Sequence, residues 1–295
     1  MYPLITRRAA LGGSLLAASA LLLPGRGARA ATVAELEQRL TQIEGHQGGR
    51  IGLAVLDVAA NRRIDYHAVE RFPLCSTFSI LAVAYVLTRV DRGQEHLERR
   101  VVFGKEDVVG FSPATRARTG GDGMTMLRLC EAAVTLGDNT AGNLLLASFG
   151  GPAALTAYAR ALGDTTTRLD RTEPELNEAT PGDPRDTTTP AAMLEDLRKI
   201  VLGNALSEPA REQLTAWLVG NKTGDNRLRA GLPETWLVAD RTGTGQNGAT
   251  NDVAVVWPPN RGPIVICSFF AESSASLEDR NGVLETIGRL VGETV

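Results

Sequence analysis

Two serines at the start of an apolar stretch are the first residues whose types and spacing could do chemistry. Residues 72–80 read FPLCSTFSI, with one hydroxyl at Ser76 and a second, three residues later, at Ser79. A serine in the first turn of an apolar helix lies near free backbone N–H groups and the positive helix end, where an oxyanion could be stabilised. Ser76 is therefore a candidate nucleophile, although a serine at this place can also serve only as a helix cap.

Three other polar segments could join Ser76 in a site. Glu173 and Asn177 bound the segment EPELN, where an acid alone would be an ordinary solvated loop residue. Asn139 ends the triplet GDN at a helix junction, where a turn with capping is the simpler interpretation. Arg241 begins RTGT at the end of a strand pattern, and its guanidinium could clamp a carboxylate or only be solvated.

The elements that must position these residues follow a simple order along the chain. Strand-like runs occupy residues 51–58, 64–68, 235–240, 252–257 and 264–271. Helical patterns cover residues 33–43, 77–90, 125–135, 140–149, 152–162, 190–202, 208–219 and 276–291. We therefore predict an α/β (α+β) fold, with a five-stranded antiparallel sheet flanked by the terminal helices, an all-helical lobe, and the active site between the lobes.

This order predicts a division of the chain into two lobes. The sheet-containing lobe would take residues 31–74 and 220–295, and the helical lobe residues 75–219. One irregular segment, at about residues 170–189, is rich in Pro, Asp, Thr and Glu and lies between helical patterns. Such a segment is typical of a compact functional loop, and it contains Glu173.

Residues 1–30 have the composition of an export signal. A pair of arginines at Arg7 and Arg8 precedes an apolar run that is too short to span a membrane, and an A-x-A sequence ends at Ala30. We therefore predict a twin-arginine-type signal peptide, export to the periplasm and no membrane anchor after its removal.

Charge and cysteine usage exclude several classes of function. The signal segment holds four of the 31 basic residues and no acid, so the mature chain has 27 basic and 34 acidic residues, a net charge of −7. That balance disfavours a nucleic-acid or anionic-membrane partner. The three cysteines and three histidines show no metal-ligand spacing, so the sequence predicts no metal and no cofactor.

The polar segments, in their order and spacing, resemble those of the class A serine β-lactamases over essentially the whole mature chain. The most specific match is EPELN together with DPRDTTTP at residues 183–190, which is similar to the Ω-loop of the family. Within it, Arg171 and Asp186 look like the ion pair that closes the loop. The resemblance implies a monomer that hydrolyses the amide bond of a small-molecule β-lactam through an acyl-enzyme.

The resemblance also implies a role for each candidate residue. Ser76 would attack the lactam carbonyl, while the N–H groups of Ser76 and Thr244 would receive the oxyanion. Glu173, with Asn177, would position the water that hydrolyses the acyl-enzyme. The residues expected to bind the substrate are Asn139, Arg241, Thr242, Gly243, Arg227 and, at the mouth of the cleft, Phe111.

All three motifs of the family are altered in this chain. The S-x-x-K motif reads STFS, so Ser79 replaces the lysine, and the S-D-N motif reads GDN, so Gly137 replaces a serine that relays a proton. The K-T-G motif reads RTG, which keeps the positive charge at Arg241. A serine at position 79 faces Ser76 on the same helix side, but its hydroxyl is no useful base and can bond the carbonyl one turn back.

These losses predict slow catalysis or none. Removing one positioned proton-transfer group typically costs ~10²- to 10⁴-fold in rate. A route remains if Glu173 activates Ser76 through its bound water, which predicts a functional but slow β-lactamase. The alternative is a catalytically impaired lactamase-like protein that binds or traps β-lactams or cell-wall fragments. A cell-wall DD-peptidase is disfavoured because that class normally lacks the glutamate of EPELN.

Overall fold

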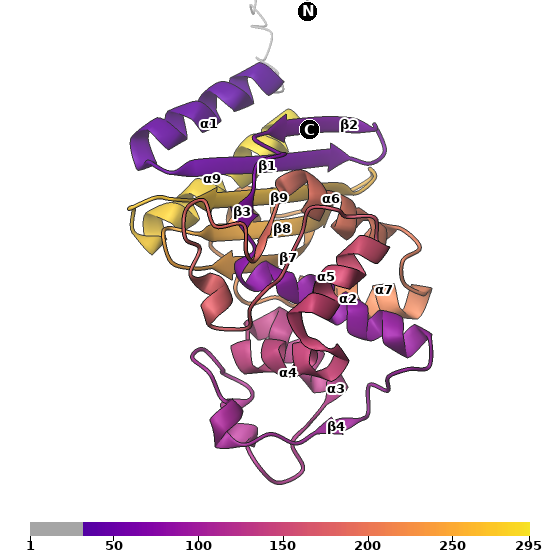
Figure 1. Ribbon diagram of the computed structural model, residues 1–295. Coiled ribbons are helices and arrows are strands. Elements are labelled where there is room, and N and C mark those ends of the chain that lie inside the picture. Colours follow the sequence, from indigo (N-terminus) through magenta and orange to yellow (C-terminus); the bar gives the residue numbers. More distant parts are fainter. Residues whose placement is uncertain (1–31) are drawn as a thin grey trace, which may run out of the picture.

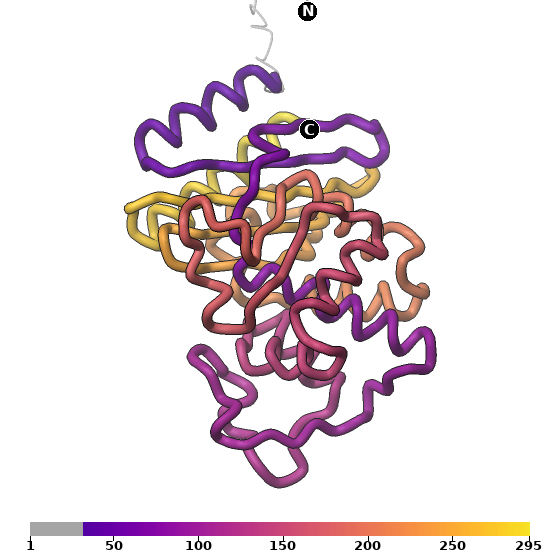
Figure 2. The backbone as a smooth tube through the Cα atoms, viewed as in Figure 1, coloured from indigo at the N-terminus to yellow at the C-terminus, as the bar shows by residue number. Residues whose placement is uncertain are grey.

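Five strands from the two ends of the chain form one antiparallel sheet in the computed structural model, which describes residues 32–295. Their order across the sheet is β2-β1-β9-β8-β7, which brings the N-terminal β1 beside the C-terminal β9 (Figure 2). The strands are β1 (Arg50–Asp57), β2 (Arg62–Tyr66), β7 (Leu237–Thr244), β8 (Thr250–Trp257) and β9 (Ile264–Ala271). The predicted five-stranded antiparallel sheet and fold class are confirmed.

One of the predicted strands ends later than expected. We predicted a strand over residues 235–240, with Arg241 just beyond it, but β7 runs from Leu237 to Thr244. The polar residues RTGT are held in the sheet by antiparallel pairing with β8, in which Arg241 lies opposite Val253 and Thr244 opposite Thr250. Backbone pairing with a neighbour overrides the weak strand propensity of Gly and charged residues.

The terminal helices α1 (Val33–Gln47) and α9 (Leu277–Thr294) cover one face of the sheet (Figure 1). Leu36 and Leu40, four residues apart on one side of α1, are buried in the same apolar cluster as Leu53 and Val55 of β1. Ala54, between Leu53 and Val55 in β1, belongs to a second apolar cluster on the opposite face of the sheet. This alternation explains why β1 is apolar along its whole length: both faces of the sheet are covered.

Most of the other helices lie on the opposite face of the sheet, toward the bottom of Figure 1. They are α2 (Phe78–Asp91), α3 (Met126–Glu131), α4 (Asn139–Phe149), α5 (Gly151–Ala161), α6 (Pro190–Leu197) and α7 (Glu208–Val219). The short α8 (Leu228–Gly231) packs against α9 instead, and its Leu228 belongs to the same apolar cluster as Leu36. The central one is α2, in which every residue from Phe78 to Ala84 is buried. A mainly apolar helix of this kind is stable only in such a core, so the turn that leads into it, with Ser76, is firmly placed.

Two predicted helices end in wider π turns. The pattern at residues 125–135 becomes α3 followed by a π turn at Ala132–Leu136, and the pattern at 190–202 becomes α6 followed by one at Arg198–Leu202. Two small sheets were not predicted. They pair β3 (Phe72–Pro73) with β6 (Thr187–Thr188), and β4 (Arg100–Val101) with β5 (Met124–Thr125).

The predicted functional loop is tied down at both ends. The expected ion pair is present, with Arg171 Nε 2.6 Å from Asp186 Oδ2, and Asp186 is almost fully buried. The other oxygen of Asp186 accepts hydrogen bonds from the backbone N–H groups of Asp170 and Arg171. Because β6 at the end of the loop pairs with β3, the loop is also joined to the segment that leads into Ser76.

The predicted signal peptide lies outside the described residues. Among residues 32–295, no helix combines the length and the apolar character that crossing a membrane requires.

Candidate active site

Ser76 lies in a tight turn that leads into α2. The turn, η1 (Cys75–Thr77), is a single 3₁₀ turn, and Cys75 before the serine has a positive φ of 45°. Within residues 32–295 the Ser76 hydroxyl caps no helix; it donates a hydrogen bond to Glu173 Oε1 over 3.1 Å. The geometry therefore favours the nucleophile over the simple cap as the interpretation of Ser76.

Glu173 is held from three directions. Its backbone N–H donates to Asn143 Oδ1 and its carbonyl accepts from Asn143 Nδ2, both over 2.8 Å. Its second carboxylate oxygen accepts a hydrogen bond from Asn177 Nδ2. Burial raises the pKa of Glu173 to about 7, although the hydrogen bonds from Ser76 and Asn177 and the charge of Arg241 act in the opposite direction. The carboxyl group is thus poised to exchange a proton near neutral pH.

Sequence reasoning missed Asn143. It lies one turn after Asn139 on the mainly apolar α4, and its amide is the clamp that fixes the backbone of Glu173. An asparagine inside the run NTAGNLLL was the available signal, because a polar side chain on a buried helix needs a partner.

Ser79 connects the nucleophile to a buried arginine. As predicted, its hydroxyl donates to the carbonyl one turn back, which is Ser76 O at 2.9 Å. The same hydroxyl accepts a hydrogen bond from Arg241 Nε over 2.8 Å. Arg241 is only 2% exposed, and burial lowers its pKa to about 10, against the opposing effect of the Glu173 and Asp240 charges. The guanidinium therefore stays charged at neutral pH beside the first turn of α2.

Gly137 adopts a left-handed conformation next to the same arginine. Its φ is +70°, at the point where the π turn after α3 ends and α4 begins. The following residue, Asp138, caps α4 by accepting from the N–H of Ala141 over 2.9 Å, which confirms the predicted capping turn. A Cβ atom on Gly137 would lie 3.5 Å from Arg241 Nη2.

Strand β7 runs close alongside the turn of Ser76. Asn251 on the neighbouring β8 donates from Nδ2 to the carbonyls of Pro73 and Leu74, over 2.8 and 3.2 Å. A Cβ atom on Gly243 would lie only 2.9 Å from Leu74 O. Glycine is therefore required at position 243 for this approach, which is a structural reason for its presence in the predicted site.

Arg227 is buried under the end of β7 and braces it. Its Nη1 donates to the carbonyls of Gly243 and Asn251 over 2.9 and 2.8 Å, and Nη2 donates to Thr244 Oγ1 over 2.6 Å. Its Nε donates to Asn281 Oδ1 over 2.9 Å. All three nitrogens of Arg227 thus have protein partners, and the contacts fix the position of Thr244.

Several of these residues border one cavity of about 410 Å³, whereas Glu173 and Gly243 lie behind its lining. Nine of the residues discussed or predicted above line it, together with Thr223 and, from α9, Leu277: Ser76, Phe111, Gly137, Asn139, Asn177, Arg227, Arg241, Thr242 and Thr244. Thr223 was not predicted; its hydroxyl hydrogen-bonds that of Thr242 over 2.5 Å. Phe111 is 61% exposed at the mouth, where its apolar ring is free to contact a ligand. Among residues 32–295 no group of His, Cys, Asp and Glu side chains could hold a metal ion.

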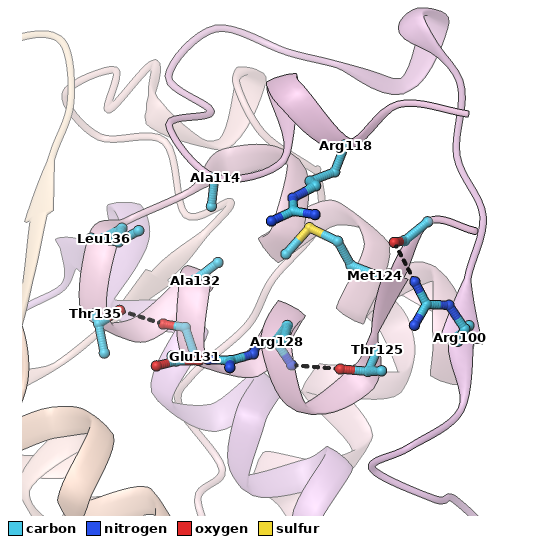
Figure 3. A pocket seen from close by; sticks show the side chains of 11 residues that line it. Arg100, Ala114, Arg118, Met124, Thr125, Arg128, Glu131, Ala132, Thr135 and Leu136 are labelled. Carbon is cyan, nitrogen blue, oxygen red and sulfur yellow. Dashed lines mark hydrogen bonds and ion pairs between the residues drawn. The ribbon is translucent and has the colours of Figure 1, made fainter. Parts of the chain in front are cut away.

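A second cavity, of about 640 Å³, lies elsewhere on the helical part of the molecule (Figure 3). Arg100, Arg118 and Arg128 line it, together with Met124 from β5. Arg128 is paired there with the carboxylate of Glu131 over 2.6 Å, and none of the predicted site residues reaches this cavity.

The fold thus brings a serine hydroxyl and a buried carboxyl together at a cavity, an arrangement typical of serine hydrolases. The chain belongs to the β-lactamase enzyme family, whose model matches residues 35–295. It is 45% identical to β-lactamase OXY-2 of Klebsiella oxytoca over 95% of this chain and 96% of that relative. It is 46% identical to β-lactamase CTX-M-97 of Escherichia coli over 87% of this chain and 88% of that relative. The solved structure of the ancestral (GNCA) class A β-lactamase is 59% identical and superposes with a TM-score of 0.86, covering 88% of this chain and all of that one.

Proposed function

We propose that this protein is a class A serine β-lactamase in which Ser76 is the nucleophile and Glu173 is the base for both halves of the reaction. The observation that carries the proposal is the direct hydrogen bond of 3.1 Å from the Ser76 hydroxyl to Glu173 Oε1, at the edge of the cavity. A nucleophile within hydrogen-bond reach of its base is the arrangement that activates a serine.

Acylation then proceeds without the lysine and the serine that the motifs lack. Glu173 takes the hydroxyl proton as Ser76 Oγ bonds to the lactam carbonyl carbon, and the carbonyl oxygen becomes the oxyanion. The backbone N–H groups of Ser76 and Thr244 receive that oxyanion. When the C–N bond breaks, the lactam nitrogen takes the proton from Glu173, and the acyl-enzyme remains on Ser76.

Deacylation uses the same carboxylate. Glu173, again ionised and held by Asn177, takes a proton from a water that attacks the acyl carbon. The bond from the carbon to Ser76 Oγ breaks, Ser76 recovers its proton, and the open product leaves.

Substrate binding is assigned to the remaining lining residues. Asn139 hydrogen-bonds the side-chain amide of the substrate, while Thr242 and Arg241 meet its carboxylate. Arg227 contributes by holding Gly243 and Thr244 in place, in keeping with its contacts to both. The ring of Phe111 forms an apolar wall at the mouth of the cavity.

A second candidate function is a protein that binds or traps β-lactams or cell-wall fragments without releasing product. The observation that favours it is the pair of residues Ser79 and Gly137, neither of which carries a basic group. The cavity and its recognition residues are the same in both cases.

The experiment that tests the proposal is hydrolysis of a chromogenic cephalosporin by the mature protein, beside a Ser76→Ala variant. We expect turnover that disappears in the variant. A burst that stops at one product per protein, with the acyl group still on Ser76 by mass spectrometry, would support the trapping function. Equal background rates and no covalent adduct would remove the β-lactamase proposal.

We propose further that residues 1–30 are a twin-arginine-type signal and that the mature protein is a periplasmic monomer of two lobes, residues 31–74 with 220–295 and residues 75–219. The candidate site is complete within one chain, which supports the monomer. N-terminal sequencing of the exported protein tests the signal: a mature chain that begins at Ala31 supports it, and export after Arg7 and Arg8 are replaced by lysines contradicts the twin-arginine route.

A further inference from the structure

The three altered motif positions, 79, 137 and 241, meet at one guanidinium group. They are far apart in the sequence, yet Arg241 Nε donates to Ser79 Oγ over 2.8 Å and Arg241 Nη2 lies 3.5 Å from the place of a Cβ on Gly137. The guanidinium therefore extends from the side chain of position 79 to the side-chain space of position 137.

Most donors of Arg241 are used inside the protein. Nε bonds Ser79, and Nη1 donates to the carbonyl of Thr242 over 2.9 Å, with longer contacts of 3.4 Å to the hydroxyls of Thr223 and Thr242. Within residues 32–295, Nη2 makes no hydrogen bond to the protein, and Arg241 lines the active-site cavity. The one unused end of this almost fully buried cation thus faces the space beside Gly137.

The shape of both small residues suits this placement. A side chain longer than serine at position 79 would meet the guanidinium, whereas the Ser79 hydroxyl accepts a hydrogen bond from Arg241 Nε and donates one to Ser76 O. Gly137 takes a φ of +70° and adds no atoms to the space in front of Nη2. The electrostatic attraction between Arg241 and Glu173 links the same cation to the proposed base.

We propose that Arg241 is the catalytic cation of this site, in place of the motif lysine and serine: Ser79 orients its guanidinium, and its Nη2–H donates a hydrogen bond to the departing lactam nitrogen through the space left by Gly137. This inference rests on the proposed β-lactamase function. Arg241 stays protonated throughout, since the proton that the nitrogen finally takes is the one that Glu173 received from Ser76. The cation stabilises charge and transfers no proton.

The first test separates catalysis from carboxylate binding. We would measure the rate constant of acylation by a saturating penicillin, with quenched samples and intact-protein mass spectrometry, in Arg241→Gln and in the control Arg128→Gln. Losing a preorganised donor at the reacting bond typically costs ~10²- to 10³-fold, and we expect a fall of this size for Arg241→Gln only. A change confined to the half-saturating penicillin concentration would overturn the proposal, because it would leave Arg241 with substrate binding alone.

The second test asks whether position 79 and Arg241 compete for one place. Glutamine reaches about as far as Arg241 Nε and leaves the space of the guanidinium head empty, where a lysine from position 79 could put its ammonium. We therefore expect Ser79→Lys to lower acylation in the parent and to raise it at least roughly tenfold in the Arg241→Gln background. Failure of the lysine to rescue the Arg241→Gln variant would contradict the assignment.

Thermal unfolding separates a failure of this inference from a failure of the proposed β-lactamase function. It compares the unsubstituted protein, Ser79→Lys, Arg241→Gln and the double variant. Two cations forced together destabilise a buried site, so Ser79→Lys should lower the melting temperature more when Arg241 is present than when it is glutamine. If Ser79→Lys lowered the melting temperature equally in both backgrounds, the placement of the guanidinium beside position 79 would be wrong, whatever the activity. If the unsubstituted protein forms no acyl-enzyme, the proposed β-lactamase function itself is wrong. The unfolding measurements do not depend on that function, so they still test where the guanidinium lies.

Discussion

The hydroxyl of Ser76 and the carboxylate of Glu173 touch directly, with 3.1 Å between Oγ and Oε1. The sequence suggested a route in which Glu173 activates Ser76 through a bound water. The direct contact arises because the loop that carries Glu173 is joined to the chain on both sides of the nucleophile, by the β3–β6 pairing and by the Asn143 clamp on α4. A base in direct contact with its nucleophile has consequences that can be measured.

The pH dependence of acylation should report Glu173. Burial raises its pKa to about 7, and a base must be ionised to accept the serine proton, so kcat/KM should rise with pH and level off above an apparent pKa near 7. Steady-state kinetics between pH 5 and 9 measure this. A profile that is flat across this range would exclude Glu173 as the base. Glu173→Gln serves as the control and should acylate ~10²- to 10⁴-fold more slowly.

Loosening the loop that holds Glu173 should cost stability and deacylation together. In Asp186→Asn the buried partner of Arg171 loses its charge, and breaking a buried ion pair typically costs ~3–5 kcal/mol. We expect a lower free energy of unfolding by urea titration and a longer-lived acyl-enzyme by mass spectrometry. Asp183→Asn, in the more exposed pair with Arg185 of the same loop, is the matched control and should change little. Equal effects of both substitutions would argue against a special role of the Arg171–Asp186 pair.

Restoring the family motifs should require three substitutions. The sequence alone suggests that Ser79→Lys with Gly137→Ser would raise hydrolysis, but Arg241 occupies the space between these positions. A serine at position 137 also has to adopt a left-handed φ, at a cost of ~1–2 kcal/mol. We therefore expect the double variant to be poor and the addition of Arg241→Lys to improve it, measured as cephalosporin turnover. A double variant faster than the triple would show that the space is free.

A second buried carboxyl, that of Asp196, should make stability depend on pH between about pH 4 and 9. Burial, with the charge of neighbouring Asp164, raises the pKa of Asp196 to about 9, so the folded protein keeps a proton that the unfolded chain releases near pH 4. Between these values the unfolded state binds fewer protons, and stability falls as pH rises, by up to ~1.4 kcal/mol per pH unit. Asp196→Asn, which mimics the protonated form, should flatten this dependence in urea unfolding at pH 5 to 8. If the free energy of unfolding of Asp196→Asn fell with pH as steeply as that of the unsubstituted protein, the pH dependence would come from other groups.

The sequence alone was enough for the order of elements, the fold class and most of the residues around the cavity. Its apolar periods predicted α2 at residues 77–90 against the observed Phe78–Asp91, and they predicted the bounds of β9 at residues 264–271 as observed. This worked because β9 is buried throughout and α2 over most of its length, so most of their positions are apolar. The polar segments around Ser76, Asn139, Glu173 and Arg241 stood out against that background.

Only the tertiary structure decided what these polar residues do to one another. Ser79 and Arg241 are 162 positions apart, and nothing in either local sequence shows that their side chains meet. The Asn143 clamp, the two small sheets and the late end of β7 depend in the same way on partners that are distant in the chain. Periodicity reports which side of an element is buried, whereas a hydrogen bond between distant residues depends on how the elements pack.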